Sequence, residues 1–206
     1  MVKVKICGIT NLEDAISAQA QGADFLGFVF AESPRRIKAD KAKRIIERLN
    51  TGIKVVALFV NEEKKAVDNI LKELERVDIL QFHGDDTPDY CRQFREKEVI
   101  KAIRIKDASS LKKIDEFKGV DYLLLDTFHS AQYGGTGMAF DWDIAVEAKD
   151  YGIPIFLSGG LNAGNVRDAV VKLRPFAVDV SSGVEKSPCR KDPEMVGRFI
   201  DIAKSA

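Results

Sequence analysis

The sequence predicts an α/β fold, a (β/α)8 barrel formed as a single domain over residues 1–206. Strand-like and helix-like patterns alternate along the whole chain, and eight strand signals pair with eight helical ones. The 206 residues give about 26 per unit. Such a barrel needs roughly 200 residues, so almost nothing is left for a second domain.

Eight short segments are rich in β-branched or aromatic residues and are bounded by turn residues, as expected for buried strands. They are Val2–Ile9, Phe25–Phe30, Lys54–Val60, Ile79–His83, Val99–Ile105, Tyr122–Thr127, Pro154–Ser158 and Phe176–Ser181. Amphipathic helical patterns lie between them, and the weakest covers Asp143–Lys149. Helix starts are indicated by the capping residues Asn11, Thr87, Asn162 and Asp192.

Alternating strands and helices produce parallel strands, which leaves a closed barrel or an open doubly wound sheet. An open sheet usually has five or six strands and a glycine-rich first turn. The first turn here, Cys7-Gly8-Ile9-Thr10-Asn11, is no dinucleotide fingerprint. The eight uninterrupted units therefore favour the barrel.

Composition excludes several classes of protein. Lysine plus arginine equals aspartate plus glutamate at 32 each, so nothing favours a nucleic-acid or membrane partner. The three cysteines are widely spaced without a CxxC motif, which argues against a disulfide framework and a structural zinc site and favours the reducing cytoplasm. Neither a signal peptide nor a transmembrane span is expected.

Strand alternation predicts which side chains face the barrel interior. Val4 and Ile6 supply the apolar face for the helices, which directs Lys5 and Cys7 inward. The same alternation directs Gln81, His83, Asp126, Asp179 and Ser181 inward. Burying so many ionisable groups costs stability, so Cys7, His83, Asp126 and Asp179 are predicted to form a site at the carboxyl ends of the strands.

Two glycine-containing turns follow the last two strands, where barrels frequently bind phosphate. They are Ser158-Gly159-Gly160-Leu161-Asn162 and Ser181-Ser182-Gly183-Val184. Small residues there expose backbone N–H groups. The alternative is that both are simply tight turns that need glycine.

A thiol and a carboxyl group inside one barrel suggest acid–base chemistry. The cation of Lys5 would favour the Cys7 thiolate, and a pKa near 7 requires roughly 2 kcal/mol of stabilisation. For Asp126 to donate a proton near neutral pH, desolvation must raise its pKa by about two units. Alone, Cys7 could equally be a small core residue and Asp126 a helix cap.

The long connections after the second and sixth strands hold further candidates. Ser33-Pro34-Arg35-Arg36 is either a solvated basic turn or a guanidinium fork for a carboxylate. Tyr133-Gly134-Gly135-Thr136-Gly137 lacks the P-loop lysine and suggests a mobile cover. His83, His129 and two aspartates would be enough ligands for a metal ion, but His129 lies in a loop, so no metal site is predicted.

Taken together, these motifs closely resemble phosphoribosylanthranilate isomerases of tryptophan biosynthesis. The matching stretches span nearly the whole chain: Lys5-Ile6-Cys7-Gly8-Ile9-Thr10, Gly27-Phe28-Val29-Phe30, Ser33-Pro34-Arg35, Phe59-Val60-Asn61, Gln81-Phe82-His83-Gly84, Leu125-Asp126, Gly134-Gly135-Thr136-Gly137, Phe140-Asp141-Trp142, Leu157-Ser158-Gly159-Gly160-Leu161 and Asp179–Glu185. Phe82 replaces the usual leucine, and Cys189 stands where the family commonly has glycine.

The resemblance implies a (β/α)8 barrel and a cofactor-free Amadori rearrangement of an anthranilate aminoaldose phosphate. It implies Cys7 as general base and Asp126 as general acid. Arg35, rather than Arg36, would bind the substrate carboxylate. The turns with Gly159, Gly160, Ser181, Ser182 and Gly183 would bind phosphate, and His83 and Asp179 would contact substrate.

Two other functions remain open from sequence: a metal-dependent phosphosugar epimerase and a non-catalytic phosphate-ligand barrel. The predicted partner is a small-molecule substrate, and the predicted assembly is a monomer or a homodimer. High lysine and glutamate content is typical of thermophilic proteins.

Overall fold

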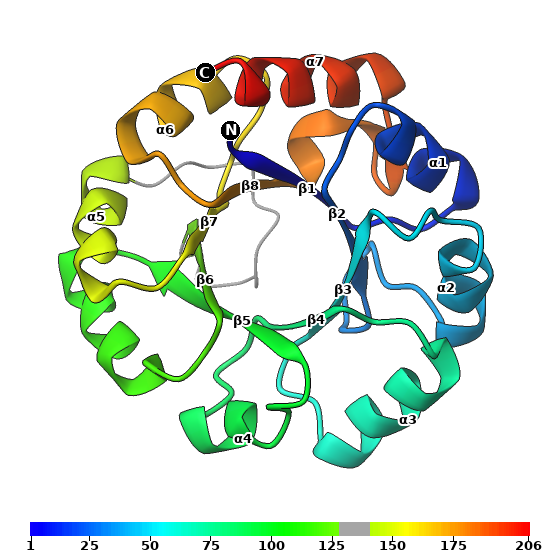
Figure 1. The fold of residues 1–206 in the computed structure, drawn as a ribbon, viewed down its shortest axis with the longest axis horizontal. Helices are drawn as coiled ribbons and strands as arrows, with labels where there is room; N and C mark the ends of the chain where they lie inside the picture. Colours follow the sequence, from blue (N-terminus) through cyan, green and yellow to red (C-terminus); the bar gives the residue numbers. More distant parts are fainter. Residues whose placement is uncertain (128–140) are drawn as a thin grey trace.

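The computed structural model describes residues 1–127 and 141–206. Eight parallel strands form a closed barrel in sequence order, and β8 hydrogen-bonds back to β1 (Figure 1). The strands are β1 (Lys3–Cys7), β2 (Phe25–Val29), β3 (Lys54–Phe59), β4 (Ile79–Phe82), β5 (Glu98–Ile105), β6 (Tyr122–Thr127), β7 (Ile155–Leu157) and β8 (Ala177–Val180). The predicted (β/α)8 TIM-barrel fold is confirmed.

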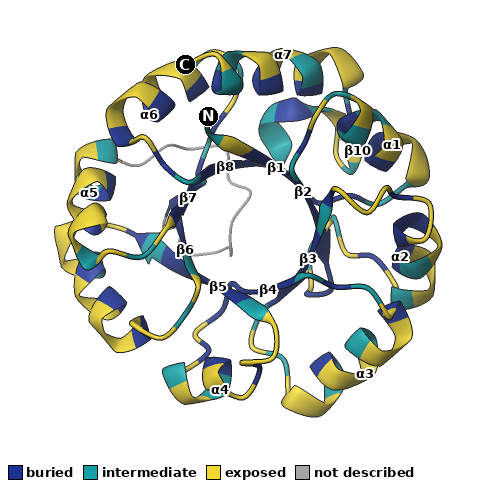
Figure 2. Cartoon of the chain, viewed as in Figure 1, coloured by how far each residue is buried: buried dark blue, intermediate teal, exposed yellow. Residues whose placement is uncertain are grey.

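Helices surround the barrel and turn their exposed faces outward (Figure 2). The α-helices are α1 (Leu12–Ala20), α2 (Ala39–Ile46), α3 (Lys64–Leu74), α4 (Pro88–Arg92), α5 (Trp142–Glu147), α6 (Val166–Leu173) and α7 (Pro193–Lys204). The 3-10 helices are η1 (Ala108–Phe117), η2 (Ala148–Tyr151) and η3 (Ser182–Val184). No helix in the described ranges is long and apolar enough to cross a membrane.

Strand alternation divides the core into two layers, as the sequence predicts. Val4 and Ile6 pack among the residues between barrel and helices. A separate apolar layer fills the barrel interior: Phe25, Val56, Ile79, Ile100, Ala102, Leu124, Phe156 and Ala177. This layer fills the part of the barrel interior nearer the amino ends of the strands. Polar side chains that face inward on the same strands therefore gather nearer the carboxyl ends.

Three local features differ from the sequence prediction. The segment after β5 is the 3-10 helix η1, where Asp107 and Ser110 bond to the adjacent backbone and so compete with regular helix formation. Asn162 accepts from the backbone N–H of Gly164 in a turn, and α6 begins only after Asn165. A short antiparallel hairpin, β9 (Glu185–Ser187) with β10 (Arg190–Lys191), follows β8 and was not predicted.

Candidate active site

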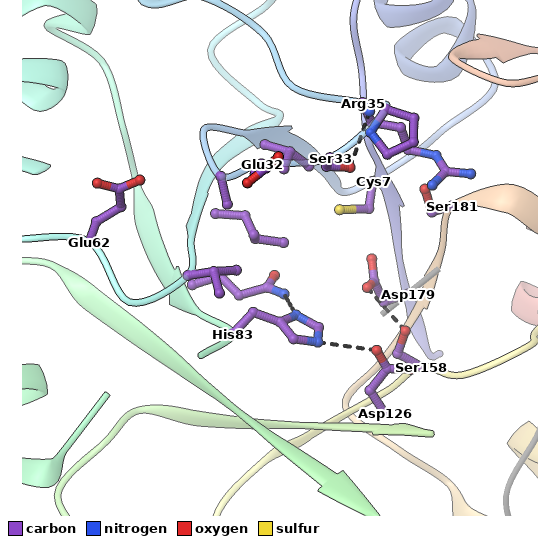
Figure 3. A pocket seen from close by; sticks show the side chains of 16 residues that line it. Cys7, Glu32, Ser33, Arg35, Glu62, His83, Asp126, Ser158, Asp179 and Ser181 are labelled. Atoms are coloured by element: carbon purple, nitrogen blue, oxygen red, sulfur yellow. Dashed lines mark hydrogen bonds and ion pairs between the residues drawn. The ribbon is translucent and has the colours of Figure 1, made fainter. Parts of the chain in front are cut away.

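A cavity of about 870 Å³ opens at the carboxyl ends of the strands (Figure 3). Cys7, His83, Asp126 and Asp179, which strand alternation directs inward, all line it. In Figure 3 the Cys7 sulfur and the Asp126 carboxylate lie on opposite sides of the open space. Its walls therefore bring a thiol and a carboxyl group to one open cavity, whose volume is typical of small-molecule sites.

Cys7 lies at the end of β1 beside a buried ion pair. The β1–β8 register pairs Lys5 with Asp179, and Lys5 Nζ donates to Asp179 Oδ1 at 2.9 Å. Gly27 of β2 leaves room for the side chains of Cys7 and Lys5, because a Cβ there would lie 2.8 Å from Cys7 Sγ and 3.1 Å from Lys5 Nζ. The register of the barrel thus fixes a cation next to the thiol.

The balance of charges around Cys7 differs from the sequence expectation. Burial raises the pKa of the Cys7 thiol, the charge of Lys5 offsets only part of this rise, and Asp179 adds to it. Burial also opposes the charge on Lys5, but Asp179 and Cys7 outweigh it and raise the pKa of the ammonium. The resting site therefore holds charged Lys5 beside a mostly protonated thiol, since desolvation disfavours the thiolate.

Asp126 lies at the end of β6 with both carboxylate oxygens engaged. The backbone N–H of Thr127 donates to Oδ1 at 2.8 Å, and Oδ2 lies 3.1 Å from His83 Nε2. His83 Nδ1 is in turn 2.9 Å from Gln81 Nε2. Gln81 and His83 share one face of the β4 strand and its end, so alternation explains how a three-residue chain reaches Asp126.

Asp179 has two partners, since Ser158 Oγ also donates to Oδ2 at 3.3 Å. Both residues line the cavity, so Asp179 holds the ends of β1 and β7 as well as facing the cavity. The expected contacts of His83 and Asp179 with substrate stay predictions.

Arg35 lines the cavity in the loop after β2. Its guanidinium holds Glu185 through two bonds, Nε to Oε1 at 2.8 Å and Nη2 to Oε2 at 2.8 Å. Lys191 Nζ donates to the same Oε1 at 2.9 Å. Burial works against the charge on Glu185, but Arg35 and Lys191 outweigh it and lower the pKa of that carboxyl.

The sequence motifs do not indicate Glu185 and Lys191, which do not line the cavity but hold Arg35 at its edge. Both lie in the β9–β10 hairpin, whose Cys189 Sγ donates to the carbonyl oxygen of Pro34 at 2.8 Å. The hairpin therefore holds the loop that carries Arg35. Within this hairpin, Cys189 has φ +67°, a left-handed backbone conformation that glycine adopts without strain.

The two turns predicted to bind phosphate follow β7 and β8 directly. Gly159 and Gly160 have φ +89° and +64°, and a Cβ on Gly183 would collide with the carbonyl oxygen of Leu161. Glycine is therefore required by backbone geometry at these positions. Ser181 lines the cavity, whereas Gly159, Gly160, Ser182 and Gly183 are not among the lining residues. Phosphate binding there stays a prediction.

Two sequence expectations fall on residues outside the described ranges: the glycine-containing cover at 133–137 and His129. Among the residues the structure describes, no three His, Cys, Asp or Glu side chains are close enough together to hold a metal ion.

Comparisons with known proteins identify a family. The family model described as N-(5'-phosphoribosyl)anthranilate (PRA) isomerase matches residues 4–202. N-(5'-phosphoribosyl)anthranilate isomerase of Citrifermentans bemidjiense is 52% identical over 205 residues, covering 99% of this chain and 98% of that protein.

Solved structures agree with the sequence match. Phosphoribosyl anthranilate isomerase from Thermotoga maritima superposes with a TM-score of 0.93 at 39% identity, covering 100% of both chains. A phosphoribosyl anthranilate isomerase structure in complex with reduced 1-(o-carboxyphenylamino)-1-deoxyribulose 5-phosphate gives a TM-score of 0.90 at 39% identity, again covering 100% of both chains. This chain belongs to the N-(5'-phosphoribosyl)anthranilate isomerase family.

Proposed function

We propose that this chain performs the reaction of its family by general acid–base catalysis with Asp126 and Cys7. The reaction converts N-(5'-phosphoribosyl)anthranilate into 1-(2-carboxyphenylamino)-1-deoxyribulose 5-phosphate, a step of tryptophan biosynthesis, and makes the protein an isomerase. The observation that carries the assignment of roles is the placement of the Cys7 thiol and the Asp126 carboxyl on opposing walls of one cavity.

In the first step, Asp126 gives a proton to the ribose ring oxygen. The bond from that oxygen to C1′ breaks, and the lone pair of the anthranilate nitrogen forms a C1′=N double bond. The product is an open-chain Schiff base cation. Such a step needs an acid within reach of the ring oxygen, which an inward-facing carboxyl at the cavity wall can supply.

In the second step, the Cys7 thiolate removes the proton from C2′. The electrons of that C–H bond form a C1′=C2′ double bond and neutralise the nitrogen. The resulting enolamine tautomerises to the ketone. Because burial raises the pKa of the resting thiol, only a fraction of molecules holds the base form, and Lys5 increases that fraction.

The two ends of the substrate need anchors that hold C2′ near the sulfur. Arg35 is proposed for the anthranilate carboxylate, because it lines the cavity and its pair with Glu185 uses Nε and Nη2 but not Nη1. The turns with Gly159, Gly160, Ser181, Ser182 and Gly183 are proposed for the phosphate. His83 and Asp179 complete the proposed contacts.

The proposed steps use only Asp126 and Cys7 as proton carriers, so they call for no cofactor. The small-molecule substrate is the proposed partner, and a monomer or homodimer in the cytoplasm is the proposed state.

A fluorescence assay on the purified protein tests this proposal. Loss of the anthranilate adduct is followed with no metal added and again with a chelator present. We expect the same turnover under both conditions. Activity that the chelator abolishes would favour the metal-dependent epimerase instead, and saturable binding without product would favour a non-catalytic barrel.

A further inference from the structure

Gln81 is a buried amide in the barrel interior that the reaction scheme above does not use. Its side chain is fully buried and lines the cavity. Its Nε2 lies 2.9 Å from His83 Nδ1, while its Oε1 has no hydrogen-bond partner among the described residues. A buried acceptor without a partner lowers stability, so a polar Gln81 at this position is better explained by function than by packing.

The hydrogen bond between Gln81 and His83 constrains where the histidine proton lies. A neutral imidazole carries one proton, and its other ring nitrogen is an acceptor. Because the Gln81 amide N–H donates to Nδ1, the proton lies on Nε2. From there it is directed to Asp126 Oδ2, 3.1 Å away.

This tautomer affects the acid of the reaction. If Nε2 were bare, the imidazole would accept the proton that Asp126 has to give to the substrate. With Nε2 already protonated, His83 can take a further proton only on Nδ1, where it would face the N–H of Gln81. Nε2 therefore cannot take the proton that Asp126 gives to the substrate, and that proton is carried on a lone pair not occupied by His83 or by the Thr127 N–H at 2.8 Å.

The same arrangement serves the product of the first step. After Asp126 releases its proton to the ring oxygen, the carboxylate accepts from the Nε2–H of His83 and the N–H of Thr127. Donors already in place stabilise a charge as it develops, without reorganisation.

We propose that Gln81 is a positioning residue that fixes His83 as the Nε2-protonated tautomer and thereby prevents Nε2 from taking the proton that Asp126 gives to the substrate. The proposal rests on the acid role of Asp126 proposed above. Gln81 acts through His83 and touches no reacting atom.

Charged groups from neighbouring elements also face this region. On β5, Arg104 stands in register with Asp126, but it lines a neighbouring pocket rather than this cavity and binds Asp85 at 2.9 Å. Across the cavity, Asp179 is neutralised by Lys5, and Glu62 lines the cavity from the loop after β3. Of the groups named here, only the Gln81 amide bonds to His83 Nδ1.

Nitrogen-15 NMR of the free protein, labelled at histidine, tests the tautomer directly, because protonated and bare ring nitrogens give well-separated signals. The chain has two histidines, His83 and His129, and a His129→Asn variant assigns the spectrum. We expect a protonated Nε2 and a bare Nδ1 for His83 at neutral pH. A protonated Nδ1 in the unmodified chain would overturn the proposal.

Two substitutions separate a positioning role from a packing role. Gln81→Glu replaces the donor with an acceptor, so we expect Nδ1 of His83 to become protonated. Gln81→Leu removes the partner, so we expect both tautomers to be populated. Wild-type nitrogen signals in both variants would contradict the proposal.

Kinetics of the same variants complete the test. We expect kcat to fall roughly 100-fold in Gln81→Glu and about 10-fold in Gln81→Leu, with little change in KM, because only acid catalysis is affected. An unchanged melting temperature of Gln81→Leu would show that the loss is not structural, whereas an unchanged kcat in both variants would overturn the role. Absence of isomerase activity in the unmodified chain would instead refute the proposed function. The NMR result on the tautomer would stand in either case.

Discussion

The two walls of the cavity prepare the proposed proton-transfer groups, Cys7 and Asp126, in different ways. The base wall consists of Lys5, Cys7 and Asp179 on β1 and β8, where strand register places a buried ion pair next to the thiol. The acid wall consists of Gln81, His83 and Asp126 on β4 and β6, where a chain of hydrogen bonds reaches the carboxyl.

The difference lies in which physical interaction controls each group. On the base wall the charge of Lys5 works against burial, so the protonation of Cys7 depends on an electrostatic balance. On the acid wall the His83 tautomer determines whether the imidazole donates to Asp126 or accepts from it. Changes of charge should therefore affect mainly the base wall, and changes of donor and acceptor mainly the acid wall.

The largest expected effect is the loss of either proton carrier. Cys7→Ala and Asp126→Asn should each lower kcat by about 10³-fold, within the usual range for general acid–base groups, with KM changed only a few-fold. Steady-state kinetics measure both constants. Near-normal turnover in either variant would remove that wall from the mechanism.

A second prediction tests the electrostatic control of the base wall. Lys5→Met removes the cation, so the pKa of Cys7 should rise further and kcat at neutral pH should fall about 10-fold, with recovery as pH rises. Alkylation of Cys7 by iodoacetamide, followed by mass spectrometry as a function of pH, measures the thiolate directly.

Two controls belong with this variant. Lys5→Met leaves Asp179 buried without its cation, which by itself costs about 3–5 kcal/mol of stability, so the Lys5→Met/Asp179→Asn double variant separates unfolding from titration. Gln81→Leu, on the acid wall, should leave the alkylation profile in place. A shift there as large as in Lys5→Met would contradict the independence of the two walls.

The sequence predicts the barrel and the inward-facing residues because both follow from local periodicity. Apolar Val4 and Ile6 determine where Lys5 and Cys7 point, and the same rule holds for Gln81 and His83 on β4. The ion pair of Lys5 with Asp179 requires the β1–β8 register, which sequence periodicity does not contain.

Other parts of the site depend on geometry that arises only in the folded chain. Whether the pKa of Cys7 is raised or lowered depends on how deeply the thiol is buried. Glu185 reaches Arg35 across 150 positions of sequence through an irregular hairpin. The residues around Arg35 and around Glu185 do not indicate this contact, because it depends on the conformations of the two loops.

A third prediction concerns the ion pair of Arg35 with Glu185 at the edge of the cavity. Glu185→Gln removes the carboxylate that orients Arg35, so we expect a several-fold rise in KM with kcat nearly unchanged. Because the pKa of Glu185 is lowered from 4.5 in the fold, its stabilising charge is present above pH 4.5 and is lost as pH falls through the lower folded value. The wild type should therefore exceed the variant by about 2 kcal/mol in unfolding free energy at pH 7.

Urea unfolding at several pH values measures this difference. The gap between wild type and Glu185→Gln should shrink as pH falls below 4.5. A gap that is constant from neutral to acidic pH would mean that the charge of Glu185 contributes nothing.

The smallest expected effect is at Cys189, whose φ of +67° is strained for a residue with a Cβ. Both Cys189→Gly and Cys189→Ala lose the Sγ bond to Pro34, but only glycine relieves the strain. Cys189→Gly should therefore be more stable than Cys189→Ala by about 1 kcal/mol in thermal unfolding. Equal stabilities would show that the hairpin relaxes around residue 189.

The most direct measurement of the division between the two walls is the kinetic isotope effect on kcat with substrate deuterated at C2′. In a Cys7→Ser variant, proton removal from C2′ should limit the rate, and the isotope effect should be large. In Asp126→Asn, ring opening should limit the rate, and the effect should be close to one. The opposite assignment, or a large effect in both variants, would contradict a base at Cys7 and an acid at Asp126.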